Sequence, residues 1–172
     1  MPVADVDGLR PTSERIRETL FNWLAGRIEG ARCLDLFAGT GALGFEALSR
    51  GAASVTFVES SSIAVRALRD AAAALAAEDA EIRAGDAFEY LATAPQPFDI
   101  VFLDPPFADD SLADLCRLLI EGGWLARGGR IYVEQDRRHA TPDLPAGVSV
   151  DKEKTAGQVR YALLTVDGPK SE

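Results

Sequence analysis

The segment of residues 32–48, RCLDLFAGTGALGFEAL, predicts a short apolar strand, a glycine turn and the first turns of a helix. Gly39 and Gly41 lack side chains, so the backbone can turn sharply there and a ligand can approach it closely. The helix that follows directs unpaired amide groups and the positive end of its dipole at this turn. We therefore expect a nucleotide-like ligand at the carboxyl end of the first strand.

Two classes of ligand share this geometry. Residues 39–44, GTGALG, fit the G-x-G-x-x-G pattern of dinucleotide-binding proteins, and Glu59 lies about where that pattern places a ribose-binding acid. A dinucleotide brings a pyrophosphate to the turn, whereas S-adenosylmethionine brings an ammonium and a sulfonium group. The carboxylate of Asp35, just before the turn, attracts an ammonium group and repels a pyrophosphate. The alternative for Asp35 is a local role as a cap of the loop amides.

The composition is that of one globular domain. The chain has 172 residues, of which 47% are hydrophobic and 26% charged, and we expect a single domain over residues 1–172. Within it we expect an extended leader (1–11), an N-terminal helix (12–30) and a catalytic core (31–172). No apolar run is as long as a membrane span and the first residues do not resemble a signal peptide, so we expect a cytoplasmic protein without membrane contact. We also expect a monomer. Cys33 and Cys116 lack metal-site spacing, which predicts two buried free thiols and no metal.

The order of the predicted elements defines the fold class. Strands are expected before the glycine turn and at 54–59, 81–84, 98–103 and 130–134, and a terminal hairpin at 148–154 and 158–166. Helices are expected at 12–24, from the glycine turn to Arg50, and at 62–77, 88–92 and 112–121. Alternation of strand and helix followed by a hairpin predicts an α/β doubly wound sheet, mostly parallel, with antiparallel pairing at one side.

Acidic residues follow the predicted strands at the edge where such sheets bind ligands. Asp35, Glu59, Asp86 and Asp104 come at the ends of the first four strands. Glu59 is suited to chelate the ribose hydroxyls of an adenosine, and Asp86 with the amide of Ala87 is suited to bind the adenine edge. Acids at strand ends are also ordinary turn formers, and that alternative stays open for Asp86.

Residues 103–107, LDPPF, predict the chemistry. The two prolines stiffen the backbone and remove two amide donors, which leaves the Asp104 carboxylate and the Pro105 carbonyl as acceptors. A rim of acceptors suits an –NH2 group, and gripping both of its hydrogens favours the pyramidal nitrogen that attacks a methyl sulfonium. Phe107 offers an aromatic face on which a base can stack. The alternative is a stiff turn with Phe107 buried.

These motifs resemble those of known methyltransferases. Residues 104–107, Asp104-Pro105-Pro106-Phe107, are similar to the (D/N)-P-P-(Y/F/W) motif of amino-group methyltransferases that use S-adenosylmethionine, and residues 34–41 look like their cofactor motif. Residues 8–24, GLRPTSERIRETLFNWL, are a long and specific match to the RsmD family, as are residues 34–52. That family methylates N2 of one guanine in the 16S ribosomal RNA of the bacterial small subunit. The resemblance extends from Gly8 to the closing hairpin and implies the seven-stranded, Rossmann-like class I methyltransferase sheet.

The resemblance also implies the roles of individual residues. The target guanine would be held by Asp104, Pro105, Pro106 and Phe107. S-adenosylmethionine would be bound by Asp35, Phe37, Ala38, Gly39, Thr40, Gly41, Glu59, Ser60, Asp86 and Ala87. The RNA contacts would come from Arg10, Thr12 and Arg15, with an ion pair at the start of the helix as the alternative role of either arginine. Members of the family usually begin with a basic hairpin before Gly8, whereas residues 1–7 of this sequence contain no lysine or arginine.

The net charge bears on the RNA partner. At −9 it argues against broad affinity for nucleic acid, because that affinity comes from neutralising phosphates. We therefore expect 16S rRNA to be recognised within a ribosomal particle, whose shape supplies further contacts. Methylation of adenine N6 or of a glutamine side chain is the alternative within the enzyme class. A dinucleotide-dependent oxidoreductase and a noncatalytic RNA-binding or assembly factor are the alternatives outside it.

Overall fold

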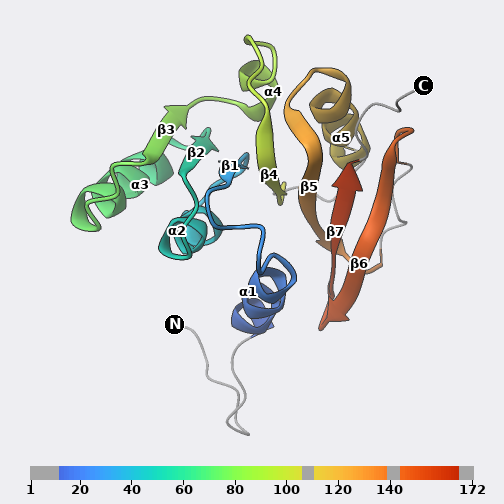
Figure 1. The fold of residues 1–172 in the computed structure, drawn as a ribbon. Coiled ribbons are helices and arrows are strands. Elements are labelled where there is room, and N and C mark those ends of the chain that lie inside the picture. The colour runs from blue at the N-terminus through green and yellow to red at the C-terminus, as the bar shows by residue number, and fades with distance from the viewer. Residues whose placement is uncertain (1–11, 106–110, 139–143, 167–172) are drawn as a thin grey trace, which may run out of the picture.

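In the computed structural model, residues 12–105, 111–138 and 144–166 are described, and their strands form one sheet. The strands are β1 (Arg32–Asp35), β2 (Ser54–Glu59), β3 (Ala80–Ala84), β4 (Phe98–Leu103), β5 (Leu125–Asp136), β6 (Val148–Ala156) and β7 (Val159–Val166). Their order across the sheet is β3-β2-β1-β4-β5-β7-β6 (Figure 1). Strands β1 to β5 are parallel to one another, and β7 is antiparallel to both β5 and β6. This confirms the predicted α/β sheet with an antiparallel hairpin.

Helices cover both faces of the sheet. They are α1 (Thr12–Trp23), α2 (Ala42–Ser49), α3 (Ser62–Ala74), α4 (Ala87–Tyr90) and α5 (Ser111–Glu121). Buried side chains of α1, α2 and α3 pack with those on one face of the sheet, and buried side chains of α4 and α5 pack with those on the other. Side chains alternate between the two faces along a strand. Near the ends of β4 and β5 the even-numbered residues, Phe102 and Tyr132, face the side covered by α1.

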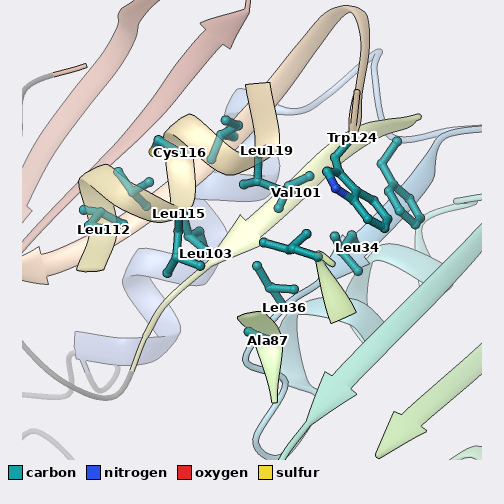
Figure 2. Packing of buried hydrophobic residues seen from close by; sticks show 14 of the residues in the cluster. Leu34, Leu36, Ala87, Val101, Leu103, Leu112, Leu115, Cys116, Leu119 and Trp124 are labelled. Atoms are coloured by element: carbon teal, nitrogen blue, oxygen red, sulfur yellow. The ribbon is translucent and has the colours of Figure 1, made fainter. Parts of the chain in front are cut away.

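The helix α5 shows how the sequence builds one of the two cores. Leu112, Leu115, Cys116 and Leu119 recur at helical spacing and are all buried against the sheet (Figure 2). Opposite them lies the nearly all-apolar strand β4, which is buried on both faces as a central parallel strand requires. The end of β4, where the candidate site begins, is therefore held by tight packing.

The helix α1 packs against the strand β7. Ile16 and Leu20 are buried in the same core as Tyr161 and Leu163 of β7. The indole ring of Trp23 stacks on the ring of Tyr161, with centroids 5.3 Å apart. The predicted helical region 12–30 is shorter in the structure, because the helix ends at Trp23 and turns follow it to Gly30.

Some element boundaries differ from the prediction. The strand β5 begins at Leu125 rather than at Arg130, because Leu125 pairs with Phe98 ahead of an irregularity in the register. The helix α3 ends at Ala74 rather than Ala77, and Ala76 adopts a left-handed conformation with φ +52°. The helix α2, in contrast, begins at Ala42 directly after the glycine turn, as predicted.

The two cysteines are buried and free, as predicted. Burial raises the pKa of each thiol to about 12, so both remain protonated and unreactive near neutral pH. The described part of the chain contains no group of three or more histidine, cysteine or acidic side chains arranged to hold a metal ion. None of its helices has the length and apolar character needed to span a membrane.

Candidate active site

The glycine turn joins β1 to α2 through two residues with positive φ. Gly39 has φ +56° and Gly41, which immediately precedes α2, has φ +84°. A Cβ atom on Gly41 would lie 2.6 Å from side-chain atoms of both Leu68 and Phe45. Gly41 is therefore required both for its backbone conformation and for the packing around it.

Asp35 is a buried acid directly beneath this turn. Its side chain is 4% exposed, and its Oδ2 atom accepts a hydrogen bond of 3.2 Å from the amide of Gly44. Burial raises the pKa of Asp35 to about 7, and the negative charges of Asp104 and Glu59 act in the same direction, whereas the Gly44 amide opposes them. The cap alternative is thus present in the structure. No cation is among the described groups that act on this carboxyl group, so a positively charged ligand near the turn would stabilise its ionised form.

Glu59 links the glycine turn to the end of β2. One carboxylate oxygen accepts a hydrogen bond of 2.7 Å from the amide of Gly39, and the other accepts one of 3.0 Å from the amide of Ser61. Each oxygen of a carboxylate has two lone pairs, so each retains one acceptor position for a ligand hydroxyl. Glu59 can therefore fix the turn and bind a diol together.

Asp86 follows β3 and caps α4. Its Oδ2 atom accepts hydrogen bonds of 2.9 and 3.2 Å from the amides of Phe88 and Glu89. Gly85, just before it, donates its amide to the carbonyl of Glu59 at 2.9 Å, which ties this loop to the end of β2. The capping role expected of a strand-end acid is present, and the second carboxylate oxygen is not used by the cap.

These strand ends enclose one cleft of about 540 Å³. The predicted site residues that line it are Phe37, Gly39, Glu59, Ser60, Asp86, Ala87, Asp104 and Pro105. The structure places Asp35 and Ala38 below the surface of the turn, and Gly41 at its junction with α2. Leu36 and Val58 also line the cleft, although the sequence indicated them only as strand residues.

Asp104 and Pro105 form the rim of the cleft at the end of β4. Asp104 lies at the solvent-exposed end of its strand. The protein atoms packed around the Asp104 carboxyl group raise its pKa above the ordinary range, and the negative charge of Glu134 adds to this shift. Pro106, Phe107 and Arg10 lie outside the described residues, as does the side chain of Thr12. Arg15 is half-buried on α1 and already interacts with another residue of the protein.

A pair of residues on β5 was not assigned a role by the sequence. The hydroxyl of Tyr132, which is fully buried, donates a hydrogen bond of 2.6 Å to the Oε2 atom of Glu134. Burial raises the pKa of Glu134, and the Tyr132 hydroxyl opposes that shift. The only sequence signal for Glu134 was its place as a further acid at a strand end, as for Glu59.

The chain is also similar in sequence to known proteins. The family model described as Conserved hypothetical protein 95 matches residues 1–165. The chain belongs to this family.

Relatives of the chain include ribosomal RNA methyltransferases. Ribosomal RNA small subunit methyltransferase D of Escherichia coli (strain K12) is 48% identical over 163 residues, which cover 95% of this chain and 82% of that protein. The protein of the same name from Haemophilus influenzae is 43% identical over 169 residues, covering 95% and 86% of the two chains. The solved structure titled "Putative methyltransferase yhhF from Escherichia coli" superposes with a TM-score of 0.88 at 45% identity, covering 90% of this chain and 88% of that one. These findings confirm the resemblance to the RsmD family.

Proposed function

We propose that this protein transfers a methyl group from S-adenosylmethionine to the exocyclic N2 amine of a guanine in 16S ribosomal RNA of the small subunit. The observation that carries the proposal is the position of Asp104 and Pro105 on the rim of the cleft whose other wall is the glycine turn above Asp35. An acceptor rim beside a cation-attracting pocket fits an amine substrate and a sulfonium methyl donor. The names of the relatives support the same activity.

The donor set of the cleft fits this cofactor. The carboxyl group of Asp35, with its pKa raised to about 7, gains a counter-ion when an ammonium group lies above the turn. Glu59 offers its two free acceptor positions to the ribose hydroxyls, and Asp86 with the amide of Ala87 borders the space for the adenine ring. The cofactor supplies an activated methyl group, so the chain itself need not provide a strong base. A pyrophosphate at the turn would instead meet the negative charges of Asp35 and Glu59, which disfavours the dinucleotide alternative.

The chemistry at the rim follows from its acceptors. The Asp104 carboxylate and the Pro105 carbonyl accept the two hydrogens of the amine, and a proline nitrogen at positions 105 and 106 has no hydrogen to compete. This orients the nitrogen lone pair toward the methyl group. Transfer of the methyl group to the amine would leave the nitrogen with one proton to lose, and the Asp104 carboxylate on the rim would accept it.

The partner is 16S rRNA within the small ribosomal subunit, and the protein acts as a cytoplasmic monomer. A net charge of −9 gives little general attraction to RNA, so recognition depends on the shape of a folded particle. Arg10, Thr12 and Arg15 are the proposed RNA contacts.

The test compares Asp104→Ala with wild type in two assays. The first follows methyl transfer from labelled S-adenosylmethionine to small subunits that lack the modification, with the modified base identified after digestion. The second measures cofactor affinity by calorimetry. We expect loss of methyl transfer with cofactor affinity preserved within a few-fold.

The matched control is Asp114→Asn, an exposed carboxylate on α5 that pairs with Arg117, and it should leave both assays unchanged. Full methyl transfer by Asp104→Ala would refute the role of Asp104. Equal losses in both assays would show that Asp104 supports the structure of the cleft rather than the transfer.

A further inference from the structure

Glu134 lies next to Asp104 across two paired strands. The parallel register of β4 and β5 aligns Phe102 with Tyr132 and Leu103 with Val133. Asp104 immediately follows the end of β4, and Glu134 is the next residue of β5. Both follow the Phe102 and Tyr132 positions by two residues and so face the α1 side of the sheet. Neighbouring strands lie about 4.8 Å apart, so the two residues are neighbours. Asp104 lines the cleft, and the negative charge of Glu134 acts on it from the adjacent strand.

The Glu134 carboxylate has a fixed orientation. The hydroxyl of Tyr132 holds its Oε2 atom at 2.6 Å, which leaves Oε1 as the oxygen available to a ligand. The Tyr132 ring is itself held between Phe102 and Tyr161, with ring centroids 6.5 Å away on each side. A carboxylate on such a support can distinguish a hydrogen-bond donor from an acceptor, because it cannot easily turn away.

The electrostatic surroundings of the pair are negative. Within the described part of the chain, no ion pair connects Asp104 or Glu134 to a cation. The described ionisable groups linked electrostatically to the pair are Asp35 from β1 and Tyr132 from β5, and neither carries positive charge. Burial raises the pKa of both carboxyl groups, and their mutual repulsion adds to the shift of Asp104. Two adjacent N–H donors from a ligand would relieve this repulsion.

Guanine presents two such donors side by side, and adenine does not. The Watson–Crick edge of guanine carries the N2 amine next to the N1–H group. On adenine the amine at N6 lies next to N1, which is a lone-pair acceptor. We propose that Glu134 selects guanine by accepting its N1–H while Asp104 holds the N2 amine. The inference rests on the proposed function and names the base that the same site accepts.

The same geometry opposes adenine. With the N6 amine held at Asp104, the N1 lone pair of adenine would face the Oε1 atom of Glu134. That contact places two acceptors together and leaves a partly buried carboxylate unpaired. A site built to receive a donor rejects an analogue that lacks it far more strongly than it rejects a change in shape.

The experiment uses two small subunits that differ at the target base. One carries guanine and the other 2-aminopurine, which keeps the amine at position 2 but has an acceptor at N1. Each is methylated by wild type, by Glu134→Gln and by Tyr132→Phe. The readout is the ratio of kcat/KM for guanine to that for 2-aminopurine.

Glu134→Gln should reverse the local donor pattern. The Tyr132 hydroxyl binds the amide oxygen, so the amide NH2 takes the place of Oε1 and donates to N1 of 2-aminopurine. We expect the guanine preference to fall by about 10- to 100-fold, the range of one specific base contact. Tyr132→Phe keeps the carboxylate but frees its orientation, so the preference should fall by less. The control Asp136→Asn, on the same strand but bound to Arg138, should leave the ratio unchanged.

Two results would overturn the inference in different ways. An unchanged ratio in Glu134→Gln, with guanine still methylated, refutes the selection by Glu134 and leaves the proposed function standing. Failure of the wild type to methylate guanine, where the Escherichia coli relative does so in the same assay, refutes the proposed function and the selection together. Thermal unfolding of each variant identifies a loss of fold, and the ratio of the two substrates is independent of the fraction of active protein.

Discussion

Replacing Asp35 by asparagine should separate the stability of the fold from the binding of its cofactor. Asp35 is 4% exposed, and burial raises its pKa from the usual 3.8 to about 7. The folded protein therefore keeps a proton that the unfolded chain releases. The stability associated with this proton is fully present below pH about 4 and is lost as the pH rises through about 7.

The expected magnitude follows from the size of the shift. A change from 3.8 to about 7 corresponds to about 4 kcal/mol in the free energy of unfolding. Asparagine keeps an acceptor for the Gly44 amide but never ionises. At pH 9 the variant should be more stable than wild type by up to about 4 kcal/mol, and near pH 4 the difference should be close to zero.

The assay is urea unfolding at several pH values, with calorimetric titration of S-adenosylmethionine on the same samples. Cofactor affinity should fall in the variant, because the neutral amide offers no charge to the ammonium group. Asp114→Asn, on the exposed face of α5, serves as the control for loss of one negative charge. A stability difference that does not change with pH would refute the proposed proton on Asp35. Unchanged cofactor affinity would refute its role in binding.

Three further predictions concern neighbouring parts of the site. Glu59→Ala should weaken S-adenosylmethionine binding by about 1.5–3 kcal/mol, measured by calorimetry. Glu81→Ala, on the edge strand β3, is the control. Unaltered affinity in Glu59→Ala would contradict the assignment of Glu59 to the ribose hydroxyls. Gly41→Ala should lower the free energy of unfolding by about 1–3 kcal/mol, because the new Cβ atom would lie 2.6 Å from Leu68 and Phe45 and the residue has φ +84°. An unchanged free energy in urea unfolding would show that the turn relaxes. The rate of methyl transfer should rise with pH through the raised pKa of Asp104, since the ionised carboxylate is the better acceptor. Glu134→Gln should move this rise to lower pH, because it removes the negative charge that raises the pKa of Asp104. An unmoved profile would exclude the electrostatic coupling between the two residues.

Much of the fold was predictable because its signals are local. The strands β2 and β4 have the bounds predicted for them, since each is an apolar run ended by polar or turn-forming residues. The glycine turn was predictable because its glycines form a local pattern in the sequence. The start of β5 was not, because Gly128 and Gly129 interrupt its pattern and only the pairing of Leu125 with Phe98 extends the strand.

The candidate site was predictable where acids follow strands and unpredictable where distant strands must align. Glu59, Asp86 and Asp104 were placed at one edge by topology alone. That Glu59 would bind the amide of Gly39, which lies 20 residues earlier, depends on tertiary packing. Glu134 acquires its significance from the register between β4 and β5, and no local pattern in the sequence encodes that register.

The contact between α1 and β7 has a consequence for synthesis of the protein. Trp23 is synthesised well before Tyr161, on which it stacks. The face of Trp23 that stacks on Tyr161 therefore stays uncovered until β7 has been translated. During that interval the nascent chain exposes an apolar patch on α1 to which a chaperone can bind. Synthesis of β7 then covers this patch, so a translation product that stops before β7 would keep the ring of Trp23 exposed.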